Sequence, residues 1–304
     1  MSNPTVAVVS PGDMGHGVAH TLHAGGLRVI SCLSGRSDRT RALAKEAGME
    51  EVPDDQTMVR EADVFLSILP PDKAPGLAER VAKALKATGS SLLYADCNAV
   101  SPGTVKRVAE TVTAAGARFA DVGIIGGSPA PGRSDGTVFY ASGPGAEEFV
   151  DLGKFGLHTQ LLGGDTGQAS GLKMCYAAFT KGQTALITEL LVAAKRLGLY
   201  DALHQEWQRA GSRPASGGSA PMSAQLQAER SIPSMPPKAY RWVPEMLEIA
   251  ATFRELGLTP RILEGASDMY ELVGHTPLAN ETPETRVRGT TVDDVVQILA
   301  EALD

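Results

Sequence analysis

Cysteine is scarce in this sequence, and there is no excess of positive charge. The three cysteines, Cys32, Cys97 and Cys175, are widely spaced and form no CxxC pair, which predicts reduced thiols and argues against disulfides or a zinc site. We expect Cys97 and Cys175 to be small core residues. The formal net charge of −7 makes nucleic acid and an anionic membrane surface unexpected partners.

Long hydrophobic runs are absent too. No segment approaches the roughly 18 apolar residues of a membrane span. The N-terminus lacks the basic stretch and apolar core of a signal peptide. The 304 residues, 43% of them hydrophobic, are enough for two domains with substantial cores. These features predict a cytoplasmic protein that acts on a small molecule.

Short strand-like runs alternate with helical patterns in the first half of the chain. Segment 37–48, SDRTRALAKEAG, is one such helix, with Ser37 as its N-cap and Gly48 as its stop. Because alternation of this kind is typical of βαβ units, we predict an α/β domain over residues 1–165, a Rossmann-type doubly wound and mainly parallel sheet. The strand-like runs are 5–9, 28–33, 63–69, 91–97 and 117–124, with 137–142 and 158–163 extending the sheet.

After about residue 166 the pattern becomes almost entirely helical. A mostly apolar stretch without proline runs from Ala169 to Leu197, which predicts a long helix buried between two domains or two subunits. We therefore predict an all-helical domain over 166–304, a homodimer, and an active site between the domains. Further helical patterns are 223–231, 242–257 and 291–303. Segments 211–221 and 232–237 have loop composition, and we expect the first to act as a lid.

The stretch VAVVSPGDMGHGVAH (6–20) predicts a dinucleotide-binding loop between a strand and a helix. In such a loop one glycine permits the tight turn, a second lets the backbone approach the pyrophosphate, and a third lets helix and strand pack closely. Here Ser10 takes the first place, and Gly12 and Gly15 keep the other two. The pyrophosphate is expected on the free N–H groups near Asp13 and Met14.

The end of the second strand, CLSGRSDRT (32–40), favours NADP(H) over NAD(H). NAD-binding domains commonly place Asp or Glu here for the ribose 2′-hydroxyl, whereas this strand ends without an acid. Ser34, Arg36 and Ser37 suit a 2′-phosphate, which a carboxylate would repel. Asp38 lies beyond the expected position of that acid. The alternative is a solvated basic loop without a nucleotide role.

Five motifs, in order, resemble those of the β-hydroxyacid dehydrogenases, a family that includes 3-hydroxyisobutyrate dehydrogenase and is related to 6-phosphogluconate dehydrogenase. The family's GLGxMGxxMAxNL stands here as SPGDMGHGVAHTL (10–22), and its nicotinamide loop as SILPPD (67–72). DxSTxSP stands as DCNAVSP (96–102), DAPVSGG as DVGIIGG (121–127), and GxGxxxKxxNN as GQASGLKMCYA (167–177). Segment 241–260 resembles a helical domain attached to such cofactor domains in bacterial oxidoreductases.

This resemblance implies an NADP(H)-dependent oxidoreductase with Lys173 in the place of the catalytic lysine. Several polar groups that the family uses around a small carboxylate-bearing substrate are replaced, by Ala99, Ile125, Tyr176 and Ala177 among others. The usual hydroxyacid substrate is therefore in doubt, while cofactor and lysine remain. The resemblance also implies Leu69 and Pro70 beside the nicotinamide, Asn98 at cofactor and substrate, and Gly126 and Gly127 at the substrate.

Lys173 is the expected general acid/base. It lies in the apolar run GLKMCYAAF, where burial would bring a lysine pKa toward the useful range; a snorkelling surface lysine is the alternative. Tyr176 follows three residues later on the same helix face, and either orients the lysine or is a core residue. Arg241 is expected to reach a substrate anion or a cofactor phosphate.

Other polar residues are expected to be structural. His16, His20 and His23 share a helix face, but no acid or cysteine lies at metal-binding spacing nearby, so no metal is expected. Asp96 and Asp121 are expected at strand ends, where they would hold loops by hydrogen bonds.

Three functions stay open. The first is reduction of a carbonyl, or oxidation of the hydroxyl compound, with NADP(H). The second is imine reduction, since imine reductases resemble the same two-domain plan and use a variable acid such as Asp or Tyr. The third is NADPH binding without turnover, which would be indifferent to Lys173→Ala.

Overall fold

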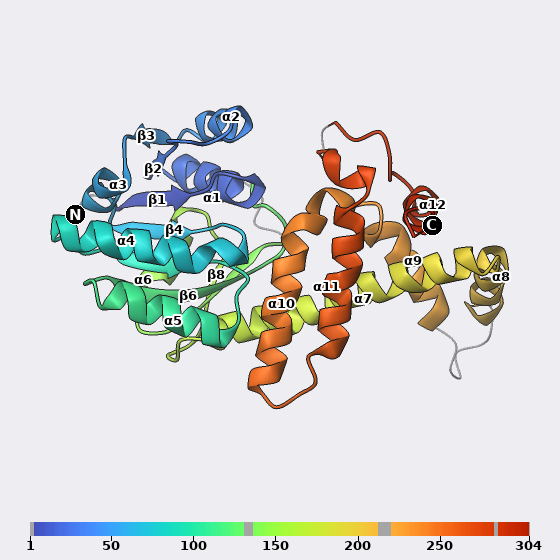
Figure 1. The fold of residues 1–304 in the computed structure, drawn as a ribbon. Coiled ribbons are helices and arrows are strands. Elements are labelled where there is room, and N and C mark those ends of the chain that lie inside the picture. Colours follow the sequence, from blue (N-terminus) through green and yellow to red (C-terminus); the bar gives the residue numbers. More distant parts are fainter. Residues whose placement is uncertain (1–2, 131–135, 212–219, 283–284, 304) are drawn as a thin grey trace. The chain divides into compact units, whose positions relative to one another are not determined.

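The computed structural model describes residues 3–130, 136–211, 220–282 and 285–303. The chain forms two compact units, Met1–Tyr176 and Ala177–Asp304 (Figure 1). The predicted boundary at 165/166 lies just before helix α7 (Gln168–Arg196), within which the two units divide.

The first unit contains an eight-stranded sheet in the order β3-β2-β1-β4-β5-β6-β7-β8. All neighbouring strands run parallel except β6 and β7, which confirms the predicted Rossmann-type architecture. Each of the seven strand-like runs forms a strand. The additional strand, β3, has the sequence Glu-Glu-Val, too short and too polar to be recognised. The strands are β1 (Thr5–Val9), β2 (Arg28–Cys32), β3 (Glu50–Val52), β4 (Val64–Ser67), β5 (Leu93–Asp96), β6 (Arg118–Ile125), β7 (Val138–Ser142) and β8 (Thr159–Gly163).

Helices cover both faces of this sheet (Figure 1). Val6 and Val8 of β1 belong to a core with residues of α1 and α6, whereas Ala7 and Val9 join a core with α3, α4 and α5. This alternation is the two-residue period of a strand buried on both faces. The helices are α1 (Asp13–Ala24), α2 (Asp38–Glu46), α3 (Asp55–Glu61), α4 (Ala74–Thr88), α5 (Pro102–Thr113) and α6 (Ala146–Val150), with the short 3-10 helices η1 (Pro71–Lys73) and η2 (Asp151–Phe155).

Side-chain caps fix where several of these helices begin. Ser37 accepts a hydrogen bond from the N–H of Thr40 and begins α2, as predicted. Asp54 caps α3 through the N–H of Thr57 at 2.7 Å, and this bond lowers the pKa of the Asp54 carboxyl. Such caps satisfy N–H groups that the helix itself leaves without a partner.

The second unit is helical over the residues described. It contains the remainder of α7, followed by α8 (Tyr200–Gly211), α9 (Ala220–Ser231), η3 (Pro236–Lys238), α10 (Ala239–Glu255), α11 (Arg261–Gly274), η4 (Pro277–Asn280) and α12 (Val292–Glu301). The four predicted helical patterns, including the long one, are confirmed. Of the predicted 211–221 loop, residues 212–219 lie outside the described part. Among the helices described, none is both long and apolar enough to cross a membrane.

Candidate active site

The loop between β1 and α1 has the geometry of a nucleotide-binding turn. Ser10 has a φ of +65°, the only non-glycine residue with positive φ in the described chain, and its carbonyl accepts the N–H of Gly12 at 2.7 Å. A Cβ at Gly15 would lie 2.5 Å from that same carbonyl oxygen, whereas a Cβ at Gly12 would meet no atom within 4 Å. Ser10 therefore makes the turn, Gly15 permits close packing, and the space beside Gly12 is open.

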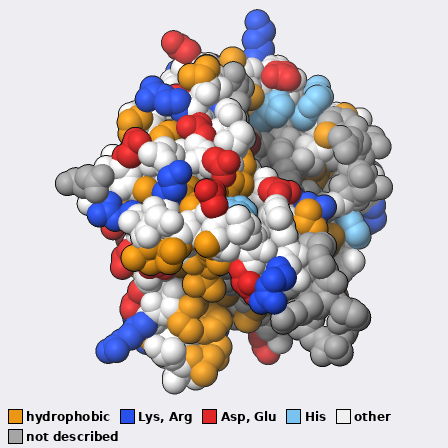
Figure 2. Space-filling view, turned by 90° about the vertical axis from the view of Figure 1, so that its right-hand side faces the viewer, with side chains coloured by type: hydrophobic (Ala, Val, Ile, Leu, Met, Phe, Trp, Pro, Cys, Tyr) orange, Lys and Arg blue, Asp and Glu red, His pale blue; other side chains and the backbone are white. Residues whose placement is uncertain are grey.

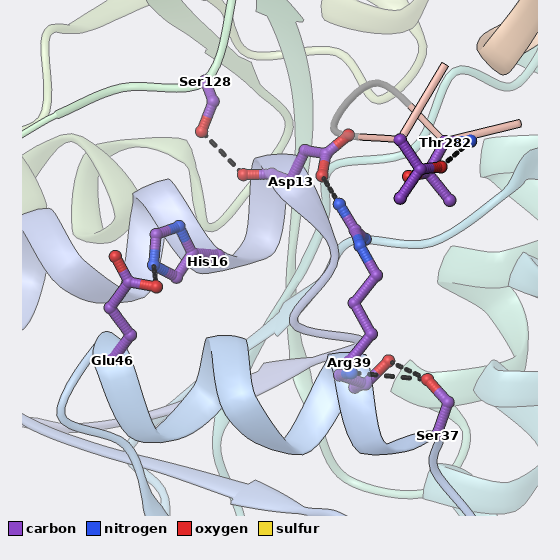
Figure 3. A network of polar contacts seen from close by, with 9 residues as sticks. Asp13, His16, Ser37, Arg39, Glu46, Ser128 and Thr282 are labelled. Atoms are coloured by element: carbon purple, nitrogen blue, oxygen red, sulfur yellow. Dashed lines mark hydrogen bonds and ion pairs between the residues drawn. The ribbon is translucent and has the colours of Figure 1, made fainter. Parts of the chain in front are cut away.

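The N-terminus of α1 offers N–H groups without a side-chain cap. Its first residue, Asp13, forms an ion pair with Arg39 at 2.9 Å, and the Asp13 carbonyl accepts a hydrogen bond from Ser128 Oγ at 2.6 Å (Figure 3). Because Arg39 compensates the Asp13 charge, an anionic ligand near Met14 would meet little net repulsion. The predicted pyrophosphate residues are thus together at this helix end.

An open pocket of about 490 Å³ lies at the carboxyl end of β2. Arg36 lines it, held by a turn in which its N–H donates to the Leu33 carbonyl at 3.1 Å. No hydrogen bond or ion pair of the Arg36 guanidinium is found among the residues described. The other lining residues are Cys32, Ser34, Gly35, Pro53, Asp54, Asp55 and Arg80.

The neighbouring polar side chains are already engaged. Arg80 forms two-pronged hydrogen bonds with Asp55 at 2.9 to 3.1 Å, and Arg41 donates to the Leu33 carbonyl at 2.7 Å. The hydroxyl of Ser37 caps α2 and lies 3.1 Å from that of Thr40 (Figure 3). Of the predicted 2′-phosphate residues, Ser34 and Arg36 therefore lie in the pocket, while Ser37 has a role in the helix.

Asn98 connects the ends of β4 and β5. Its side-chain carbonyl accepts the N–H of Leu69 at 2.8 Å, and its amide donates to Ser67 Oγ at 2.8 Å and to both oxygens of Asp96 at 3.0 Å. The side chain is buried. Asn98 thus holds the Leu69–Pro70 loop, and all of its polar atoms have protein partners.

Lys173 lies on α7, in the part of this helix that packs on β6. A Cβ at Gly123 would lie 3.3 Å from the Lys173 Cβ and 2.5 Å from the Ala169 carbonyl oxygen, so the helix and the strand are in close contact. Lys173 is partly exposed, and Tyr176, one turn later, is 49% exposed. The structure therefore contradicts the alternative that Tyr176 is a core residue.

The predicted substrate glycines make a bend after β6. Gly126 has a φ of +130°, and a Cβ there would overlap the Gly136 carbonyl. Gly127 accepts a hydrogen bond from Thr137 Oγ1 at 2.6 Å. The bend brings the next residues against α1, where a Cβ at Gly17 would overlap Ser128 and Pro129. The close approach of Ser128 and Pro129 to Gly17 was not predicted. A further glycine two residues after Gly15 is a sequence signal that could have indicated it.

Arg241 belongs to the second unit, where it is partly buried on α10. Beside it, sequence reasoning missed an ion pair between Lys181 of α7 and Glu245 of α10, whose side chains are only 14% and 9% exposed. The Lys181 ammonium also lies 5.2 Å from the ring centre of Trp242, and Tyr270 Oη donates to the Lys181 carbonyl at 2.6 Å. The sequence shows no periodic signal that would pair residues 64 positions apart.

The remaining candidates have structural surroundings. His16 Nε2 lies 3.8 Å from Glu46 (Figure 3), and within the described chain no group of three or more His, Cys, Asp or Glu is arranged to hold a metal. Burial, Asp96 and Asp121 raise the pKa of Cys97 well above its usual value, as befits a core thiol. The corresponding expectation for Cys175 is wrong, because it is exposed.

Comparison with known proteins agrees with this geometry. Residues 5–152 match the family model of the NAD binding domain of 6-phosphogluconate dehydrogenase. Residues 194–273 match a domain of unknown function, DUF1932. The first unit thus contains a Rossmann-type NAD-binding domain similar to the first family, and the second unit carries a helical domain similar to the other.

Individual relatives point the same way. An uncharacterized 28.5 kDa protein of Methanothermus fervidus is 30% identical over 177 residues, which are 58% of this chain and 66%, just under two thirds, of that protein. The conserved protein MTH1747 of unknown function, described as structurally similar to 3-hydroxyacid dehydrogenases, has a TM-score of 0.61 at 28% identity, over 89% of this chain and 99% of that one.

Two enzymes share the fold at lower identity. A 3-hydroxyisobutyrate dehydrogenase from Mycobacterium tuberculosis, solved with L-serine, has a TM-score of 0.66 at 18% identity, over 98% of this chain and 99% of its own. An imine reductase from Myxococcus stipitatus, solved with NAD+, has a TM-score of 0.53 at 15% identity, over the whole of both chains. The chain thus has an NAD(P)-binding, dehydrogenase-like fold, and the predicted resemblance is confirmed.

Proposed function

We propose that this protein is an NADP(H)-dependent oxidoreductase of a small carbonyl or hydroxy compound, with Lys173 as general acid/base. The observation that carries the proposal is the Arg36 guanidinium, which lines the pocket at the end of β2 and has no partner among the described residues. In a Rossmann domain this is where the ribose of the adenosine half lies. Arginine suits a 2′-phosphate because its planar donors match the phosphate oxygens.

The rest of the cofactor would follow the loop beyond β1. The pyrophosphate would sit on the N–H groups of Asp13 and Met14, beside the open space at Gly12. Leu69 and Pro70, held by Asn98, would line the nicotinamide. The bound nicotinamide supplies or accepts the hydride.

Lys173 would move the proton that accompanies this hydride. In reduction its ammonium donates a proton to the carbonyl oxygen as the C–H bond forms, and in oxidation its amine takes that proton back. A positioned acid/base of this kind is typically worth about 10² to 10⁴ in rate. Tyr176, one turn away, would orient the lysine or donate a second hydrogen bond.

The test is NADPH oxidation with a panel of small aldehydes, ketones and ketone–amine mixtures, for the wild type, Lys173→Ala and the control Lys86→Ala. We expect turnover by the wild type and the control, a loss of about 10² to 10⁴ in Lys173→Ala, and unchanged NADPH binding. Turnover that survives Lys173→Ala contradicts the assigned acid. NADPH binding without turnover of any compound supports the non-catalytic alternative.

Imine reduction is the second candidate function. Tyr176 stands where the resembled family has an asparagine, lies next to Lys173 and is half exposed, so that it would supply the acid itself. Turnover of ketone–amine mixtures but not of ketones, lost in Tyr176→Phe and retained in Lys173→Ala, is the result that favours this function.

We also propose that the protein works as a homodimer. On α7, Phe179 and Leu186 are 67% and 61% exposed and lie seven residues apart, hence on one helix face. Leu197, directly after the helix, is 71% exposed. Exposed apolar side chains are also visible between charged ones in Figure 2. A second copy would remove this stripe from water; Lys173 chemistry does not depend on it.

A further inference from the structure

The residue that precedes helix α7, Gly167, has no side chain with which to cap the helix. Gly167 precedes the helix with a φ of +107°, a conformation that favours glycine and excludes the usual Ser, Thr or Asp cap at this position. The cap comes instead from Asp121, a fully buried carboxylate in the middle of β6. This position corrects the expectation that Asp121 ends a strand.

The Asp121 carboxylate accepts four hydrogen bonds. Its Oδ2 accepts the N–H groups of Gly167 at 2.8 Å and Ser170 at 3.1 Å, and the Ser142 hydroxyl at 2.9 Å. Its Oδ1 accepts the Ser170 hydroxyl at 2.7 Å. Ser142 Oγ in turn accepts the N–H of Ala169 at 3.0 Å. The negative charge therefore lies at the positive end of the helix dipole, surrounded by donors.

The remaining N–H groups of this turn are satisfied within the segment. Gln168 donates to the Asp165 carbonyl at 3.3 Å, and Gly171 donates to the Gly167 carbonyl at 2.9 Å. Every N–H from 167 to 171 therefore has an acceptor, and this helix end does not present free donors to a ligand. The carboxylate of Asp121 therefore acts as the cap of α7.

Helix α7 packs on this same face of β6 as far as Lys173. Gly123 lies two residues after Asp121, hence on the same face, and its missing side chain lets the Ala169 carbonyl and the Lys173 Cβ approach. Lys173 follows Ser170 by three residues, one helical turn. Asp121 fixes the start of this turn, and Gly123 fixes its distance from the sheet.

We infer that Asp121 is a positioning residue for Lys173, acting as the cap that Gly167 cannot provide. The inference concerns the placement of Lys173 and rests on the proposed function only where turnover is measured. Asp121→Asn keeps the size of the side chain but replaces an accepting oxygen by a donating NH₂, which faces N–H donors. The first turn of α7 then loses its cap, and the lysine loses its fixed position.

The experiment compares wild type, Asp121→Asn and the matched control Asp165→Asn, an exposed aspartate next to the same helix start. Hydrogen exchange of peptide 167–173 is expected to accelerate about tenfold in Asp121→Asn, the factor that corresponds to a lost cap. The rate of Lys173 modification by an amine reagent should change relative to exposed Lys86. NADPH affinity and the control should remain at wild-type values.

Two further variants test the role of Asp121, one for the case that Asp121→Asn does not fold and one for the case that a substrate is found. If Asp121→Asn does not fold, Ser142→Ala, which removes the Ala169 acceptor and one of the four donors to Asp121, should give the same changes to a smaller extent. With a turned-over substrate, adding Asp121→Asn to Lys173→Ala should cost nothing more, because Asp121 acts through the lysine. Wild-type exchange and wild-type Lys173 labelling in a folded Asp121→Asn protein overturn the inference. Without turnover in the wild type the proposed function fails, but exchange and labelling still decide the role of Asp121.

Discussion

The carbonyl oxygen of Ser10 lies where a side chain at Gly15 would begin, 2.5 Å from the position of a Cβ. The turn that brings this carbonyl over α1 requires the left-handed conformation of Ser10, with a φ of +65°. A non-glycine residue pays roughly 1 kcal/mol for this conformation. The loop is therefore held by a strained serine on one side and an obligatory glycine on the other.

Replacing Ser10 by glycine should release this strain. We expect Ser10→Gly to raise the free energy of unfolding by about 1 kcal/mol, seen as an increase of about 2 to 4 °C in thermal melting. The hydroxyl of Ser10 has no protein partner among the described residues. Because Ser10 is a proposed cofactor-binding residue, losing this hydroxyl should also lower NADPH affinity in the same variant. A lower melting temperature would show that the hydroxyl contributes more to the fold than the strained backbone costs.

Gly12 and Gly15 should respond differently to the same substitution. Gly15→Ala forces apart Ser10 and α1, so both stability and NADPH affinity should fall. Gly12→Ala meets no protein atom within 4 Å, so the melting temperature should change little while affinity falls, because the methyl group occupies the space that the pyrophosphate needs. Equal NADPH affinity in Gly12→Ala and wild type would contradict the assigned position of the cofactor.

The sequence was informative wherever a local pattern carries the structure. Short apolar runs between helical patterns were enough to predict the sheet. The Ser37 cap and the turn geometry at Ser10 and Gly15 were predicted correctly because their partners lie within a few residues, whereas cofactor binding at this turn stays a prediction. Strand β3 was missed because two of its three residues are exposed glutamates, so its pairing with β2 decides its conformation. The cap of α7 by Asp121 joins residues 46 to 49 positions apart, and no hydrophobic periodicity of the sequence predicts such a contact.

The contact between α1 and the segment after β6 predicts a second glycine that does not tolerate a side chain. Gly17→Ala would place a methyl group on Ser128 and Pro129, and should displace this segment without touching Gly12 or Gly15. We expect faster proteolysis or hydrogen exchange around 126–129, with the β1 strand protected as in wild type. Ser128→Ala, which removes only the 2.6 Å hydrogen bond to Asp13, should have a smaller effect in the same direction. Unchanged exchange in both variants would mean that this contact does not hold the segment.

The buried Lys181–Glu245 pair predicts a marked asymmetry between single and double substitutions. Lys181→Met or Glu245→Leu leaves one charge in a site that is at least 86% buried for both side chains, and each should lower the free energy of unfolding by about 3 kcal/mol. The double variant should recover most of this loss, because apolar side chains of similar size replace both charges. Chemical denaturation of the full chain measures the three values. Additive losses would contradict a mutual ion pair.

Thiol labelling should separate the three cysteines. Reagents attack the thiolate, and the raised pKa of buried Cys97 keeps it protonated at neutral pH. Exposed Cys175 should therefore react first in the folded protein, and Cys175→Ser should remove this phase. Cys32 lines the pocket at the end of β2, so NADPH should slow its labelling. Labelling of Cys32 that is indifferent to NADPH would contradict a nucleotide in this pocket.

A fluorescence titration of NADPH and NADH determines whether the pocket that Arg36 lines selects NADP(H). The proteins are wild type, Arg36→Ala and the control Arg60→Ala, an exposed arginine of α3 outside the pocket. We expect wild type and control to prefer NADPH, and Arg36→Ala to lose about 2 kcal/mol of NADPH binding, the scale of a charged hydrogen bond, with NADH affinity unchanged. A wild type that prefers NADH, or an Arg36→Ala variant that still prefers NADPH, would contradict a role of Arg36 in selecting NADP(H).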